Sequence, residues 1–174
     1  MDAPPTKENS IKFLKFSDLF RSIKINCPDI LESNLKKGFL LLTDLGFDHY
    51  LAALEKDPEL LEPLYNDALI TLQILQSDAK SIMGHFSHYD ENMLRGETDL
   101  FSEWVCLKEL GISFNKGELS QWKDCVEILL KSALNQPQVV VHRDFHSRNL
   151  IYRNLNNPGV LDFQDAVIGP ITYD

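Results

Sequence analysis

The stretch Gln138–Phe163, QVVVHRDFHSRNLIYRNLNNPGVLDF, consists of two short apolar runs separated by a polar segment. Val139–Val141 is a continuous run of β-branched residues, which is typical of a buried strand. The second run, Gly159–Phe163, follows the turn-forming residues Asn-Asn-Pro at 156–158. We therefore expect a strand, a polar loop and a second strand.

Three polar side chains stand out in this stretch, Asp144, Asn149 and Asp162. Asp144 closes a His-Arg-Asp triplet, Asn149 follows five positions later, and Asp162 lies at the end of the second expected strand. Phosphoryl transfer needs a carboxylate to accept the proton of the attacking hydroxyl, and oxygen ligands to hold Mg²⁺ against the nucleotide phosphates. The spacing predicts that Asp144 is the catalytic base and that Asn149 and Asp162 bind the metal.

The loop resembles that of the protein-kinase-like phosphotransferases, and more closely that of their aminoglycoside phosphotransferase branch. In that branch His usually stands two positions after the catalytic Asp, as His146 does here, whereas protein kinases usually have Lys. A protein kinase has Gly two residues after the metal-binding Asp and then a long activation segment. This chain has Gln164 and soon reaches Tyr173-Asp174, as in the shorter small-molecule kinases.

Two other interpretations of the loop stay open. If the strand continued, His142, Asp144 and His146 would share one face and could form the metal site of a hydrolase. Alternatively, the polar residues could simply fill a turn. The family resemblance instead implies that His142, His146 and Asp174 support the catalytic loop.

Composition narrows the classes of protein that the chain can belong to. The 174 residues include 44% apolar and 25% charged residues, as in a globular protein. The net charge of −9 argues against nucleic acid as a partner. No apolar run is long enough to span a membrane, and no signal peptide is visible. The isolated cysteines (Cys27, Cys106 and Cys125) indicate reduced thiols in a cytoplasmic protein.

The N-terminal part predicts one helix and one strand. Residues 8–23 have helical periodicity, with Ile11, Leu14, Leu19 and Ile23 expected to face inward and Phe13, Phe16 and Phe20 to widen that face. Gly38–Leu42 predicts a buried strand. By composition the residues after it form only a turn, but the resemblance implies a hinge between two lobes where Leu42, Thr43 and Asp44 pair with adenine through backbone groups.

The middle of the chain predicts three helices. Their apolar stripes are Leu61, Leu64, Ala68, Leu72 and Leu75, then Leu100, Trp104, Leu107 and Leu110, then Leu119, Trp122, Val126, Leu129 and Ala133. Asn115 is the expected N-cap of the third helix, and both tryptophans are expected in the core. His85 and His88 lie in a linking stretch and are interpreted as surface or core residues, not as metal ligands.

The segment 90–103, DENMLRGETDLFSE, is unusually acidic. Such a run usually forms only a solvated helix face. The resemblance implies that this region borders the acceptor pocket, where Glu97 or Asp99 could bind sugar hydroxyls.

A kinase of this type also needs a glycine-rich loop and a basic residue on the nucleotide phosphates. The chain has neither G-x-G-x-x-G nor a Walker A pattern. Aligned to the family, its first residues fall near the end of the third N-lobe strand. We therefore expect either a central fragment, inactive on its own, or a degenerate relative.

Together these features predict an α+β, protein-kinase-like fold, with a partial N-terminal lobe over residues 1–44 and a mostly helical lobe over 45–174. The stretches MDAPP, GFLLLTDLG and LDFQDAVIGPITYD most resemble bacterial sugar kinases that act on the anomeric hydroxyl of N-acetylmuramate or N-acetylglucosamine in cell-wall recycling. The resemblance implies ATP and Mg²⁺ as cofactors and a small amino sugar as acceptor. Aminoglycoside phosphorylation and an inactive kinase-like scaffold are the alternatives.

Overall fold

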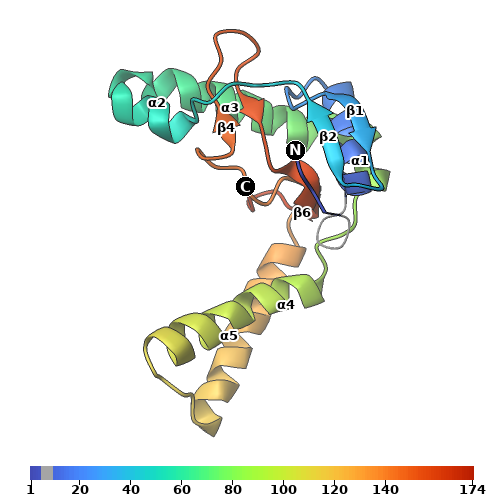
Figure 1. The fold of residues 1–174 in the computed structure, drawn as a ribbon. Helices are drawn as coiled ribbons and strands as arrows, with labels where there is room; N and C mark the ends of the chain where they lie inside the picture. Colours follow the sequence, from blue (N-terminus) through green and yellow to red (C-terminus); the bar gives the residue numbers. More distant parts are fainter. Residues whose placement is uncertain (5–9) are drawn as a thin grey trace.

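The computed structural model describes residues 1–4 and 10–174. Figure 1 shows that most of the chain gathers in one body, from which a pair of helices projects. In chain order the elements are α1 (Ser10–Ser22), β1 (Ile30–Asn34), β2 (Phe39–Leu42), α2 (Tyr50–Lys56), η1 (Pro58–Leu60), α3 (Leu61–Ser77), η2 (Asp78–Ser81), η3 (Met83–His85), α4 (Glu91–Leu100), η4 (Phe101–Glu109), α5 (Lys116–Leu134), β3 (Gln138–Val141), β4 (Leu150–Ile151), β5 (Gly159–Val160), η5 (Phe163–Asp165) and β6 (Val167–Pro170).

Helix α1 packs through its phenylalanines. Phe13, Phe16 and Phe20 recur at helical spacing and are buried, whereas Ile11, which we expected to face inward, is 67% exposed. Phe163 is fully buried, and its ring lies 4.9 Å from that of Phe13 and 5.5 Å from that of Phe20. The helix thus braces the residue that follows Asp162. The expected start at residues 8 and 9 lies outside the described residues.

A strand is present at the expected position as β2, and it belongs to a hairpin. The expectation that it is buried was wrong, since Phe39 is 51% exposed and Leu41 is 59% exposed. Strand β1 pairs with it antiparallel, from Ile30 opposite Leu42 to Asn34 opposite Phe39. The first residues of the chain lie along β2 as well, because the Ala3 amide donates to the Gly38 carbonyl. β1 was not expected from the sequence, since its residues, ILESN, are mostly exposed and have no apolar alternation.

The two strands expected within residues 138–163, β3 and β5, do not pair with each other. β3 pairs antiparallel with β6, with Val141 opposite Val167 and Val139 opposite Gly169. The second expected strand, Gly159–Phe163, is shorter than expected: β5 ends at Val160 and pairs with β4, which the sequence analysis missed. After β5 the backbone turns sharply at Asp162, and the chain then forms η5 and β6.

Helix α3 lies against the strands and buries most of the expected stripe. Leu64, Ala68 and Leu75 are buried, whereas Leu61, at the first turn, is 55% exposed. The stretch after α3 forms short 3₁₀ turns, and His85 and His88 are exposed there.

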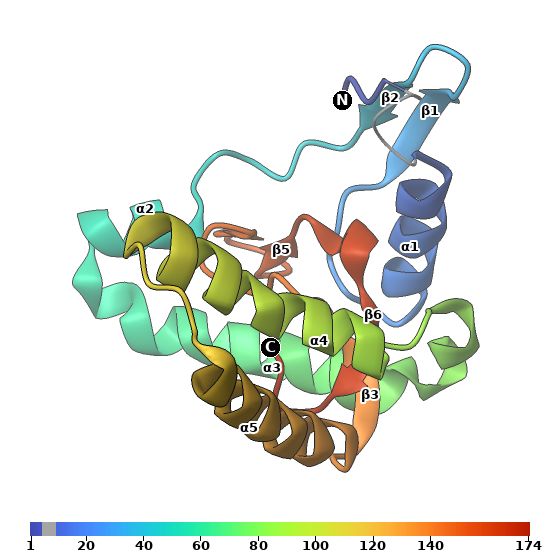
Figure 2. The same ribbon diagram turned by 90° about the horizontal axis from the view of Figure 1, so that it is seen from below.

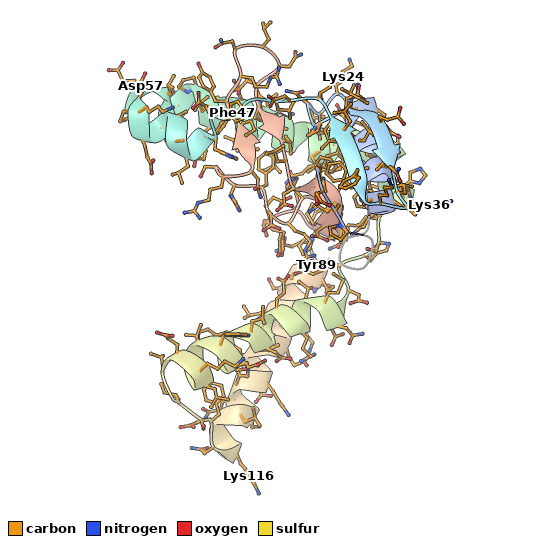
Figure 3. The ribbon with its side chains drawn as sticks, viewed as in Figure 1. Lys24, Lys36, Phe47, Asp57, Tyr89 and Lys116 are labelled. Carbon is orange, nitrogen blue, oxygen red and sulfur yellow. The ribbon has the colours of Figure 1, made fainter. Side chains whose placement is uncertain are left out.

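Helices α4 and α5, with the π-helix η4 that extends α4, form the projecting hairpin, and Figure 2 shows them side by side. Tyr89 lies where the hairpin leaves the body, and Lys116 lies at the far end (Figure 3). Asn115 caps α5 with a complete capping box, as expected. Trp122 is partly buried, but Trp104 is 56% exposed, so the expectation of a core position was wrong for Trp104.

The buried residues form two clusters. The larger one joins α1, β2, α2 and α3 to the strands that flank the loop. The smaller one joins the base of the α4–α5 hairpin to one face of β3 and β6, and includes Tyr89, Val141 and Val167. Within the described residues, no helix is long and apolar enough to cross a bilayer.

Gly169 sits where these two strands and Tyr89 come closest. A Cβ at this position would lie 2.9 Å from Val141 Cγ2 and 3.5 Å from Tyr89 Cβ. We predict that Gly169→Ala lowers the free energy of unfolding by about 1–3 kcal/mol, since a buried branched side chain must shift. Gly96→Ala is the control: outside the neighbouring helix backbone, no described atom lies within 4 Å of a Cβ added there, and alanine favours a helix over glycine by about 0.5–1 kcal/mol. Urea unfolding measures both, and equal stability of Gly169→Ala and wild type would contradict the packing.

Candidate active site

The loop begins with a buried histidine. The His142 side chain is fully buried, its Nε2 lies 2.9 Å from the Leu161 carbonyl oxygen, and its Nδ1 accepts from the Asp144 amide at 3.3 Å. An amide donor at Nδ1 requires the proton to be on Nε2, so the ring is neutral and donates to Leu161. Burial lowers the pKa of His142 to about 4. His142 therefore links the loop to the residue that precedes Asp162.

This geometry argues against the hydrolase interpretation. β3 ends at Val141, so the alternation of His142, Asp144 and His146 does not continue as a strand, and the His142 ring is inside the core. Among the described residues, no group of three or more histidine, cysteine or acidic side chains is placed to hold a metal ion.

Asp174 holds the backbone at the start of the loop. Its carboxylate accepts from the amide of His142 at 2.6 Å and from the amide of Arg143 at 2.8 Å. Burial raises the pKa of Asp174, and the two amide donors oppose that shift by stabilising the charged form. The expected supporting role of Asp174 thus corresponds to two specific backbone hydrogen bonds.

Asp144 projects from the loop toward solvent. Its side chain is exposed, and among the described residues none donates a hydrogen bond to its carboxylate. The preceding Arg143 has a left-handed backbone (φ +79°), which is uncommon for a residue with a side chain. The turn leaves the carboxylate free to accept a proton from a bound molecule.

Asn149 is oriented by the same loop. Its side-chain Nδ2 donates to the Asp144 carbonyl oxygen at 3.0 Å. Because that partner can only accept, the NH₂ group must face it, and Oδ1 is left for another partner. The Asn149 carbonyl also accepts from the Leu161 amide at 2.9 Å, which extends the β4–β5 pairing toward Asp162.

Asp162 lies directly beyond this pairing. It is exposed and left-handed (φ +61°), and the buried Phe163 that follows it fixes the turn. Gln164 Nε2 donates to Asp162 Oδ1 at 2.6 Å, and Oδ2 has no partner among the described residues. Carboxylate and amide oxygens are the ligands that Mg²⁺ prefers, so the oxygens of Asn149 and Asp162 fit that ion.

No role was expected for Gln164 from the sequence. The only signal was that a polar side chain stands where a protein kinase has glycine. Its short hydrogen bond to Asp162 shows why the difference matters, because it restricts how that carboxylate can turn.

His146 stabilises the loop from within. Its amide donates to the Asp144 carbonyl at 3.0 Å, and its Nδ1 accepts from the Arg148 amide at 3.2 Å. Helix α2 contacts the same loop, since the Leu51 amide donates to the Ser147 carbonyl at 3.1 Å.

The expected hinge lies at the end of β2. The Thr43 amide donates to the Asp29 carbonyl at 2.9 Å, and its hydroxyl accepts from the Asp29 amide at 2.8 Å. Asp44 Oδ1 accepts from the Gly46 amide at 2.8 Å. Leu42 packs against the larger core cluster. The Thr43 amide is therefore already used, and the carbonyl of Asp44 and the amide of Leu45 have no partner within the described part of the chain.

Glu97 and Asp99 face different surroundings. Residues two positions apart in a helix, such as Glu97 and Asp99, point in directions about 200° apart around the helix axis. Glu97 reaches the loop, where its carboxylate accepts from Arg143 Nη2 at 3.0 Å. Asp99 instead lines a cavity of about 400 Å³ between α4 and α5, together with Trp122 and Glu127. The structure brings Glu97, but not Asp99, to the loop that carries Asp144.

The buried His142 makes stability depend on pH. An unfolded histidine has a pKa near 6.5, whereas the pKa of folded His142 is about 4, so the unfolded chain binds more protons between these values. The free energy of unfolding should therefore fall as the pH falls from about 6.5 to about 4, by up to about 3 kcal/mol from this residue.

Urea unfolding of wild type and His142→Gln at pH 7 and pH 4.5 tests this. The raised pKa of Asp174 acts in the opposite direction, but it is present in both proteins and largely cancels in their difference. We expect the stability advantage of wild type to narrow at pH 4.5. An advantage that does not change with pH would contradict a buried, neutral His142.

Comparison with known proteins gives both relatives and a fold. The chain is 44% identical over 176 residues to an N-acetylmuramate/N-acetylglucosamine kinase of Pseudomonas aeruginosa, and 39% identical over 176 residues to one of Neisseria meningitidis. Each alignment covers all of this chain but only 50% and 51% of the relative. The chain thus spans about half the length of the curated relatives it matches.

Solved structures of aminoglycoside phosphotransferases share the fold. The ADP-bound enzyme APH(2'')-Ib has a TM-score of 0.61 at 18% identity, over 93% of this chain and 56% of that one. The streptomycin–ATP complex of APH(2")-IIa has a TM-score of 0.60 at 19% identity, over 95% of this chain and 59% of that one. The expected α+β, protein-kinase-like fold is confirmed. Since the profile of the phosphotransferase enzyme family matches residues 1–174, the chain belongs to that family.

Proposed function

We propose that the complete protein is an ATP- and Mg²⁺-dependent kinase that phosphorylates a hydroxyl of a small amino sugar, of the N-acetylmuramate or N-acetylglucosamine type. The observation that carries this proposal is the orientation of Asn149: its NH₂ group donates to the Asp144 carbonyl oxygen, so its Oδ1 is left for another partner on the loop that also carries the unengaged Asp144 carboxylate. The names of the relatives support the choice of sugar.

The proposed mechanism assigns one role to each of the polar residues in and around the loop. Asp144 accepts the proton of the acceptor hydroxyl as the hydroxyl oxygen attacks the γ-phosphorus of ATP, and the bond to the β–γ bridging oxygen breaks to release ADP. Asn149 Oδ1 and the Asp162 carboxylate would hold Mg²⁺, which would neutralise charge on the phosphate oxygens. His142 and Asp174 keep the loop in place, and Gln164 limits the rotation of Asp162.

The nucleotide base is proposed to bind at the end of β2. Of the expected segment Leu42, Thr43 and Asp44, the backbone carbonyl of Asp44 is available, together with the amide of Leu45. A neighbouring carbonyl and amide can pair with an adenine edge as acceptor and donor. Nucleotide binding of this kind is supported by solved structures of the same fold that contain ADP or ATP.

The acceptor is proposed to be a small molecule. The segment between Asp162 and Asp174 folds back as η5 and β6 into the core, so this segment offers no platform for an extended peptide. The net charge of −9 disfavours nucleic acid, and the cytoplasm is the proposed location.

Phosphate transfer from ATP to a panel of acceptors tests the proposal. The complete protein should phosphorylate N-acetylated amino sugars, and should not phosphorylate aminoglycosides or a generic protein. Transfer only to aminoglycosides would overturn the sugar assignment, transfer only to protein would overturn the small-molecule branch, and no transfer would favour the inactive scaffold.

Asp144→Asn is the matched control for the same assay. It preserves size and removes the base, so turnover should fall by about two to four orders of magnitude. Nucleotide affinity, measured by calorimetry, should be largely unchanged, because Asp144 faces the acceptor. Wild-type turnover in this variant would exclude Asp144 as the base.

A further inference from the structure

A small cluster of side chains joins the base of the projecting hairpin to the catalytic loop. It consists of Tyr89, Glu97, Arg143 and Tyr173, which we call the Glu97 cluster. Glu97 comes from α4, Arg143 directly precedes Asp144, and Tyr173 directly precedes Asp174. Tyr89 lies at the point where the hairpin leaves the body (Figure 3).

Glu97 is the centre of this cluster. Its Oε1 accepts from Arg143 Nη2 at 3.0 Å, and its Oε2 accepts from the Tyr173 hydroxyl at 3.1 Å. The Tyr89 hydroxyl lies 3.4 Å from that of Tyr173, and the two rings meet edge to face. The Arg143 guanidinium lies 5.2 Å from the centre of the Tyr89 ring. Both Glu97 oxygens are therefore engaged before any acceptor binds.

The backbone of Arg143 explains why this matters for catalysis. Its left-handed conformation turns the next residue, Asp144, out of the loop, and such strained residues persist only where their surroundings hold them. Two carboxylates do so here. Asp174 holds the backbone amides of His142 and Arg143, and Glu97 holds the Arg143 side chain.

Glu97 also compensates the positive charge of the Arg143 guanidinium. Its side chain is 27% exposed, and its Nε is buried without a hydrogen-bond partner among the described residues. Without Glu97 the guanidinium would lose its carboxylate in a partly buried position. A charge left in that state favours rearrangement toward water, and the backbone turn would move with it.

We propose that Glu97 is a positioning residue that acts through Arg143 to fix the turn in front of Asp144. It is not a ligand of the acceptor in this account, which differs from the role that the family resemblance implied. This inference rests on the proposed kinase function, since its kinetic consequence is defined for that reaction.

Kinetics of Glu97→Ala and Glu97→Gln in the complete protein give the first test. We expect kcat to fall about tenfold to a hundredfold in Glu97→Ala, the scale associated with a misplaced catalytic group, with KM values for ATP and sugar nearly unchanged. The Glu97→Gln side chain can still accept a hydrogen bond from Arg143, so its kcat should lie between those of wild type and Glu97→Ala. Glu91→Gln is the control, since Glu91 bonds an arginine on the same helix but away from the loop.

A double-mutant cycle separates positioning from direct binding. If Glu97 acts through Arg143, then adding Arg143→Ala to Glu97→Ala should slow the enzyme little further. A rise in the sugar KM with unchanged kcat, or additive losses in the double variant, would overturn the proposal.

Hydrogen exchange provides a readout that needs no activity. Amides of residues 142–149 should exchange faster in Glu97→Gln than in wild type, and Glu91→Gln should match wild type. Unchanged exchange in Glu97→Gln would contradict the positioning role even in an active enzyme. An inactive wild type with faster exchange in Glu97→Gln would instead refute the kinase function and leave the structural link supported.

Discussion

The imidazole of His142 donates to the Leu161 carbonyl and accepts from the Asp144 amide. One buried ring thereby connects the segment that carries the proposed base with the segment that carries Asp162. Such a bridge requires a neutral ring, because Nε2 must be protonated to donate to Leu161 and Nδ1 must be unprotonated to accept from Asp144. The surrounding core supplies that condition by lowering the pKa to about 4.

The rest of the structure holds the two ends of this bridge. On one side, Asp174 and Glu97 hold the backbone and the side chain of Arg143, next to Asp144. On the other, the phenylalanines of α1 pack on Phe163, next to Asp162. The polar groups of the site are thus exposed, while the residues directly beside them are buried or bonded, which is how a solvent-facing site can be held rigid.

The sequence predicted the parts that depend on local pattern. The loop, β3, the hydrophobic stripe of α3 and the Asn115 cap follow from spacing and capping chemistry. β1 was missed because its residues are mostly polar, and β4 was missed because two residues are too few to show a periodicity. The exposure of Trp104 was missed because an apolar stripe on a helix does not reveal whether another element covers it. The bonds from Gln164 to Asp162 and from Glu97 to Arg143 depend on tertiary contacts. The division at residues 44 and 45 and the site roles stay predictions.

The proposed mechanism depends on a divalent cation that Asn149 and Asp162 would hold jointly on the nucleotide. Titration calorimetry of ATP binding to the complete protein, with Mg²⁺ and with EDTA, measures this most directly. We expect Asp162→Ala to lose the gain in ATP affinity that Mg²⁺ provides, and Asn149→Ala to lose part of it, since a neutral amide ligand offsets less phosphate charge than a carboxylate. A full Mg²⁺-dependent gain in Asp162→Ala would show that Asp162 does not hold the cation.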